Sequence, residues 1–284
     1  MTAFKSDVIN RVSYQVNGAD LSVLQAGKVG NPVALLIHGI PANALLWTKV
    51  IEALSAQGYF VVAPDLPGFG ETTVTDKSQY GIQASANLLN DWIITQGWQD
   101  IWLVAHDIGG GVAQGLMVAN EAVFQKATIS NAITADTWPV PAMQGLIDAA
   151  NAQQFEIAAE SGMLAEQLAP LVRATFVNQQ QITDEVLETV FLDSKLNTET
   201  GRVKFAHLLR SLTNEDTLAN MEALKNVNLP VNLIWAMQDP NQPWEGPGSI
   251  LLNTFKNVTV NKIEQAGHFL QIDAEKEYLN LLLS

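Results

Sequence analysis

Short apolar runs recur along the chain and alternate with longer segments in which apolar residues repeat every three or four positions. A short apolar run is typical of a buried strand, and the longer period is typical of an amphipathic helix. The predicted strands are residues 14–16, 21–24, 33–37, 59–63, 101–104, 127–129, 231–235 and 258–260. The predicted helices are residues 44–56, 82–96, 110–120 and 275–283. This alternation predicts an α/β fold with a mostly parallel central sheet and helices on both faces.

One long interval interrupts the alternation. Residues 138–224 contain no convincing strand, only helical segments of mixed polarity. The predicted helices in this interval are residues 142–152, 155–161, 162–176, 183–191 and 202–211. We interpret a helical block between two strands of an α/β sheet as an inserted lid, with residues 1–137 and 225–284 forming the core domain. The alternative is that these helices simply pack on the sheet.

The segment 102–111 carries the most specific chemical signal. An apolar run leads directly into a helical pattern, and Asp107 stands at the junction among small residues. Small neighbours leave room for a strained turn that pushes the middle side chain outward, as in a nucleophile elbow. A carboxylate in that place can attack a saturated carbon, open a C–O or C–halogen bond and leave an alkyl ester on the protein. The alternative role for Asp107 is an N-cap of the following helix.

Four motifs together resemble the α/β-hydrolase fold family over essentially the whole chain. They are Leu-Ile-His-Gly-Ile-Pro at 36–41, Pro-Asp-Leu-Pro-Gly-Phe-Gly at 64–70, the turn at Asp107, and Ala-Gly-His-Phe at 266–269. The resemblance implies the α/β-hydrolase fold with a helical lid inserted in the core, and it implies that Asp107 is the nucleophile.

The resemblance also implies the two partners of the nucleophile. His268 follows the last predicted strand in a loop that begins with glycine, where the family places its base; imidazole titrates near neutral pH and can activate water. Asp239 follows the strand at 231–235 and is the expected acid that orients the imidazole. Asp136, beyond the strand at 127–129, is the alternative, because some relatives carry the acid on that side.

The expected oxyanion hole consists of the backbone N–H groups of Ile40 and Ile108. Haloalkane dehalogenases commonly carry side chains with N–H groups at these two positions, and isoleucine has none. Many epoxide hydrolases protonate the opening epoxide with lid tyrosines, whereas none of the four tyrosines of this chain lies in residues 138–224.

Five other residues are candidates for contact with the substrate. His38 and His106 lie inside the motifs, and His207 lies in the predicted lid, where it could deliver a proton. The indoles of Trp138 and Trp244 could donate an N–H to a departing oxygen or halide, although packing is the commoner use of tryptophan.

These residues predict a hydrolase that opens an uncharged organic substrate through an ester on Asp107, followed by attack of water activated by His268. An epoxide hydrolase-like activity is the first expectation, and a haloalkane or haloacid dehalogenase is the second. Carbonyl ester hydrolysis suits an aspartate nucleophile poorly, because the acyl-aspartate anhydride is high in energy. The remaining alternative is a catalytically silent ligand-binding protein. No cofactor and no metal ion are expected.

Composition narrows the partners. The 284 residues carry a formal net charge of −14, spread through the chain, so nucleic acid and anionic membrane surfaces are not expected to bind. The absence of cysteine excludes disulfides and thiolate metal sites. Without an apolar signal segment or a run near ~18 apolar residues, we expect a cytoplasmic monomer or homodimer.

Overall fold

The computed structural model describes residues 6–155, 163–192 and 198–284. Its strands form one sheet in the order β1-β2-β4-β3-β6-β7-β8-β9, with the short β5 paired to β2. The strands are β1 (Asn10–Val16), β2 (Ala19–Ala26), β3 (Val33–Ile37), β4 (Phe60–Pro64), β5 (Thr73–Val74), β6 (Ile101–His106), β7 (Phe124–Ser130), β8 (Val231–Ala236) and β9 (Val258–Ile263). Pairing is antiparallel around β2 and parallel from β4 to β9. The predicted mostly parallel α/β sheet is confirmed.

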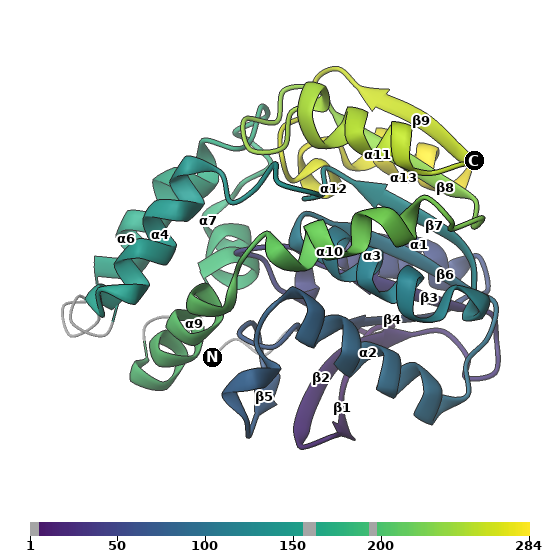
Figure 1. Cartoon of the computed structure of the whole chain (residues 1–284), viewed down its shortest axis with the longest axis horizontal. Helices are drawn as coiled ribbons and strands as arrows, with labels where there is room; N and C mark the ends of the chain where they lie inside the picture. Colours follow the sequence, from purple (N-terminus) through teal and green to yellow (C-terminus); the bar gives the residue numbers. More distant parts are fainter. Residues whose placement is uncertain (1–5, 156–162, 193–197) are drawn as a thin grey trace.

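The central strands are the most deeply buried, because helices cover both faces of the sheet there. Every residue of β3, β4 and β6 is buried, whereas the edge strand β9 is largely half-buried or exposed. The helices of the core are α1 (Thr48–Ala56), α2 (Ile82–Gln96), α3 (Ile108–Asn120), α10 (Glu215–Leu224), α11 (Ser249–Thr254), α12 (Leu270–Asp273) and α13 (Glu275–Leu283). Helices α2, α3 and α10 pack together on one face, and α1 and α13 lie on the other (Figure 1).

The described residues between β7 and β8 contain helices and no strand. They form α4 (Pro141–Asn151), α6 (Met163–Arg173), α7 (Asp184–Val186), a π-helical segment (Leu187–Leu192), α9 (Glu199–Ser211) and then α10. Figure 1 shows α4, α6, α7 and α9 beyond one end of the sheet. Of the predicted helix at 155–161, all but Phe155 lies outside the described residues.

Helix α10, the last helix of the predicted lid, lies on the core instead of beyond the sheet. Asp216 accepts the N–H of Gln83 at the start of α2 over 3.0 Å, and the Thr217 hydroxyl donates to the Ala135 carbonyl over 2.7 Å. Within the described ranges, no helix has the length and apolar character needed to cross a bilayer.

The connection from β6 to α3 is a tight turn with Asp107 at its centre. Asp107 has φ 54° and ψ −123°, a backbone conformation that residues other than glycine rarely adopt. The helix starts directly afterwards, so its first residues press against β3. A Cβ at Gly109 would lie 2.4 Å from the carbonyl oxygens of Ile37 and His38. The glycine is therefore required for the close approach that holds the turn.

We expect Gly109→Ala to lower the free energy of unfolding by about 1–3 kcal/mol, because a methyl group there must displace backbone atoms. Gly145→Ala is the matched control. Its added Cβ meets nothing within 4 Å in α4, and alanine favours a helix over glycine by about 1 kcal/mol. Urea unfolding of both variants measures the difference, and similar stabilities would contradict the steric explanation.

Candidate active site

Four strand ends bring the expected catalytic groups together. Ile40 follows β3, Asp107 follows β6, Asp239 follows β8 and His268 follows β9. The carboxyl ends of parallel strands meet at one edge of a sheet, so residues far apart in sequence become neighbours there. All four residues are buried.

The Asp107 carboxylate lies between a backbone donor and an imidazole. Its Oδ1 accepts the N–H of Ile40 over 2.8 Å, and its Oδ2 lies 3.6 Å from Nε2 of His268. Burial raises the pKa of Asp107, while His268 and the N–H groups of Ile108 and Ile40 lower it, and the net shift is upward. The expected oxyanion donors are thus the groups that favour the ionised nucleophile.

His268 is held at three points. Its Nδ1 contacts Oδ2 of Asp239 at 2.7 Å, its main-chain N–H donates to the Thr175 carbonyl over 2.9 Å, and its own carbonyl lies 2.9 Å from Nε2 of His106. Burial lowers the pKa of His268, but the negative charges of Asp239 and Asp107 raise it by a larger amount. The pKa of His268 therefore lies above its ordinary value. The ring is therefore fixed with Nε2 toward Asp107.

Asp239, and not Asp136, is the acid that contacts the imidazole. Asp136 is exposed. Asp239 is buried, and besides His268 it accepts the Asn131 side-chain N–H over 2.8 Å and the Asn241 main-chain N–H over 2.7 Å. Burial raises the pKa of Asp239, but His268 and the main-chain N–H groups of Asn241 and Gln242 lower it below its ordinary value. An ionised acid is expected at neutral pH.

His38 and His106 support the backbone instead of facing a substrate. Nε2 of His38 accepts the N–H of Leu66 over 3.0 Å, so its Nδ1 carries the proton and donates to the Gly39 carbonyl over 3.0 Å. Nε2 of His106 donates to the His268 carbonyl, while its Nδ1 has no partner among the described residues. Burial holds the pKa of His106 well below its ordinary value, which keeps the ring neutral.

The motif at 64–70 contains a buried carboxylate, Asp65, which binds neighbouring segments of the backbone. Asp65 pairs with Arg11 at 2.5 Å and accepts the N–H groups of Ala44 and Glu71 over 2.8 and 2.9 Å. Burial raises the pKa of Asp65, but Arg11 and these N–H groups lower it below its ordinary value. The ionised Asp65 thereby ties the loop after β4 to the segment that follows the Ile40 donor.

The structure does not bring His207 to this site. Its ring lies 6.1 Å from that of Tyr80. Gly201, Lys204 and Phe205 of the same helix line a pocket, and His207 does not line it.

The two candidate tryptophans differ. Trp244 packs against Trp235 with ring centroids 5.8 Å apart, and the Lys262 ammonium lies 4.3 Å above its ring, so it serves packing. Trp138 is buried, and its indole N–H has no hydrogen-bond partner among the described residues.

In the part of the chain that the structure describes, no group of three or more His, Asp or Glu side chains is arranged to hold a metal ion.

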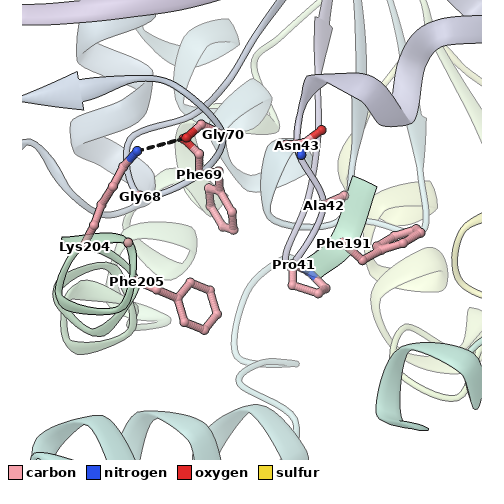
Figure 2. Close-up of a pocket in the computed structure, with 10 residues that line it drawn as sticks. Pro41, Ala42, Asn43, Gly68, Phe69, Gly70, Phe191, Lys204 and Phe205 are labelled. Atoms are coloured by element: carbon pink, nitrogen blue, oxygen red, sulfur yellow. Dashed lines mark hydrogen bonds between the residues drawn. The ribbon is translucent and has the colours of Figure 1, made fainter. Parts of the chain in front are cut away.

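A small pocket lies beside the candidate catalytic groups. Figure 2 shows Phe69, Phe205 and Pro41 around a common space, with Phe191 on the far side. The Lys204 ammonium donates to the carbonyl oxygens of loop 69–70 over 3.2 Å each. The rings of Phe69, Phe191 and Phe205 give the lining an apolar part, which suits an apolar organic group.

The pocket does not include Asp107 or His268 in its lining, but it begins next to both. Pro41 directly follows the Ile40 donor. Phe191 packs on Phe269, the neighbour of His268, with ring centroids 4.5 Å apart.

Residues 32–275 match the family described as alpha/beta hydrolase fold. The chain belongs to this family. An alpha/beta hydrolase fold protein from Burkholderia ambifaria has a similar structure, with a TM-score of 0.82 and 20% identity over 98% of both chains. Epoxide hydrolase CorEH is similar with a TM-score of 0.75 and 20% identity over 97% of both chains. At such identities the likeness establishes the fold of this alpha/beta hydrolase and nothing finer.

The Mesoderm-specific transcript protein of Mus musculus is 24% identical over 275 residues, which are 89% of the chain and 78% of the relative. Other sequence relatives match segments of this alpha/beta hydrolase. An uncharacterised protein of Mycobacterium tuberculosis is 39% identical over 82 residues, which are 29% of the chain and 24% of the relative. Epoxide hydrolase A of the same organism is 48% identical over 54 residues, 19% of the chain and 17% of the relative. Haloalkane dehalogenase of Psychrobacter cryohalolentis is 33% identical over 98 residues, 34% of the chain and 32% of the relative.

Sequence reasoning missed two polar side chains of the site. Asn131 holds Asp239 and also accepts the N–H of Ala236 at the end of β8 over 2.8 Å. Its signal was available, since it is a polar residue at the carboxyl end of a buried strand. The second is Asp273, which accepts the N–H of Gly267 over 2.7 Å. Nothing local in the sequence indicates that contact.

We expect the imidazole of His268 to titrate above 6.5, its ordinary value, because the anions of Asp239 and Asp107 stabilise its protonated form. Asp239→Asn removes the nearer anion and should lower that pKa. Asp136→Asn is the control, since Asp136 is exposed and should leave the titration unchanged. NMR titration of the ring measures all three proteins, and a shift in Asp136→Asn alone would reassign the acid.

Proposed function

We propose that this alpha/beta hydrolase opens a small uncharged substrate at a saturated carbon through an ester on Asp107, and that the substrate is an epoxide. The observation that supports the proposal is the buried Asp107 carboxylate, with Oδ1 on the Ile40 N–H and Oδ2 facing Nε2 of His268. A carboxylate nucleophile favours alkyl transfer, because attack on a carbonyl group would produce a high-energy anhydride.

In the first step Oδ2 of Asp107 attacks an epoxide carbon. The new C–O bond forms as the C–O bond of the ring breaks, and the ring oxygen leaves as an alkoxide that takes a proton from a donor or from water. The carboxylate becomes an alkyl ester with Oδ1 as its carbonyl oxygen. His268 has no chemical part in this step.

In the second step Nε2 of His268 removes a proton from water, and the oxygen of that water attacks Cγ of Asp107. Negative charge develops on Oδ1, where the N–H of Ile40 already donates and that of Ile108 lies close by. Collapse breaks the bond from Cγ to the alkyl oxygen, and the imidazolium returns its proton to the leaving alkoxide. The Asp107 carboxyl group then releases its remaining proton, which restores the carboxylate and replaces the proton taken up in the first step. The product is a diol, and Asp239 stabilises the transient charge on His268.

The leaving group distinguishes the first candidate from the second. The side chains of Ile40 and Ile108 cannot donate to a halide, and segmental similarity to epoxide hydrolase A agrees with an epoxide. Halide release is the second candidate, favoured by the buried Trp138 N–H without a described acceptor and by segmental similarity to a haloalkane dehalogenase. A departing halide needs such a donor but no proton.

The helices between β7 and α10 are proposed to act as the lid over this edge of the sheet. Of these helices, Phe191, Gly201, Lys204 and Phe205 line the pocket, and the two phenylalanines lie across from Pro41 and Phe69 of the core. The phenyl rings favour an aromatic substituent on the substrate, so styrene oxide is a suitable first probe beside bromoethane.

We expect His268→Gln to accumulate the ester, with its hydrolysis at least about a hundredfold slower, because no base remains to activate water. Incubation with styrene oxide should raise the intact mass by that of the whole epoxide. With bromoethane it should rise by an ethyl group in place of a hydrogen. Asp107→Asn is the control and should form neither adduct. Unmodified His268→Gln under conditions where the wild type turns over would falsify the two-step mechanism; no adduct and no turnover with any epoxide or haloalkane would favour a silent binding protein.

We expect Trp138→Phe to slow ester formation about tenfold, because one N–H bond to a developing anion is lost. His207→Phe should leave it within about twofold, because His207 lies against Tyr80. Stopped-flow alkylation rates compare the two variants. An unchanged rate in Trp138→Phe would remove the indole from the site, and a strong effect of His207→Phe would restore the histidine as proton donor.

A further inference from the structure

The loop that carries His268 is bound to a segment of the helical block, residues 175–178, which follows α6 directly. The main-chain N–H of His268 donates to the Thr175 carbonyl over 2.9 Å. The ring of Phe176 stacks on that of Phe269, with centroids 5.7 Å apart and planes inclined by 26°. The backbone and the next side chain of the catalytic loop therefore both contact this segment.

A single buried carboxylate joins the two segments. Asp273, at the end of α12, accepts the N–H of Gly267 from the histidine loop over 2.7 Å. It also accepts the N–H groups of Val177 and Asn178 from the helical block, over 2.9 and 2.7 Å. Asp273 is only 5% exposed, so its charge is satisfied by these backbone donors and not by water.

The contact leaves no room for adjustment. A Cβ at Gly267 would lie 2.0 Å from the Thr175 carbonyl oxygen, which is the oxygen that accepts the His268 N–H. The position of His268 therefore depends on the distance between its loop and segment 175–178. Asp273 binds both segments and so constrains that distance.

We propose that Asp273 is a positioning residue for His268, acting by binding the histidine loop and segment 175–178 to one carboxylate. The inference rests on the proposed function, because it concerns the step in which His268 activates water. It assigns to the helical block a part in placing the base, beyond covering the site.

The two chemical steps depend on this contact differently. Attack by Asp107 uses the turn after β6 and the Ile40 donor, and the described hydrogen bonds of Asp273 reach neither of them. Ester hydrolysis needs Nε2 of His268 at the correct distance from a water and from Cγ of Asp107. Loss of the Asp273 contact should therefore slow hydrolysis and spare alkylation, whereas general destabilisation would not separate the two steps.

The test compares Asp273→Asn with the wild-type chain in single turnovers of styrene oxide, following the ester by intact mass. We expect hydrolysis to slow by about tenfold to a hundredfold, since displacements near 1 Å cost rates of that order. Alkylation should stay within about twofold, so the ester accumulates. Asp216→Asn is the matched control. Asp216 also accepts a main-chain N–H, but its donor is Gln83 at the start of α2 and not a residue of the histidine loop. It should leave the ratio of the two rates unchanged.

Asp273→Glu keeps the carboxylate and decides the matter if Asp273→Asn does not fold. Asp273→Glu should slow hydrolysis more than alkylation. The effect on hydrolysis should be smaller than that of Asp273→Asn. Equal changes in both steps for a folded Asp273 variant, or the same ratio change in Asp216→Asn, would overturn the inference while leaving the Asp107 mechanism intact. If the wild-type chain forms no ester with styrene oxide or bromoethane, it is the proposed function that fails.

Discussion

The main-chain conformation of Asp107 is the constraint on which the rest of the site depends. At φ 54° the residue adopts a strained conformation, and α3 starts at the next residue, Ile108. That start forces backbone contact with β3, which explains the glycine at 109, and a Cβ at Gly39 would likewise lie 2.4 Å from the Cβ of Asp107. The Ile40 donor can reach Oδ1 because nothing larger than glycine stands between them.

Around this turn, main-chain N–H groups help to satisfy each of three buried carboxylates. Asp65, Asp239 and Asp273 are each enclosed, and each accepts main-chain N–H groups from segments that carry a catalytic group or its neighbour. An enclosed carboxylate without such donors would strongly destabilise the fold, so the position of each loop is tied to folding itself. Geometry in this site is thus maintained by the same contacts that stabilise the protein.

The sequence was sufficient wherever the information is local. The strong periods at 82–96 and 275–283 coincide with α2 and α13, and the motif at Asp107 specified a turn whose dihedral angles the structure contains. Choosing Asp239 over Asp136 required the structure, since both follow strands and only packing shows that one of them is exposed. The side of α9 that carries His207 was also undetermined, because a helix of mixed polarity does not fix its own rotation. Contacts such as Asp273 with Val177 join positions 96 residues apart, and no local pattern encodes them.

The attachment of segment 175–178 to the histidine loop has a consequence for how molecules enter. At its other end the helical block is anchored by α10, through Asp216 on α2 and Thr217 on the loop after β7. Between these anchors, α9 meets the core at the loop of Gly68 to Gly70, partly through the side chain of Lys204. These contacts of α9 involve loop 68–70 and not the loop of His268. In the proposed mechanism, a substrate that entered along α9 would therefore leave the contacts between Asp273 and segment 175–178 in place.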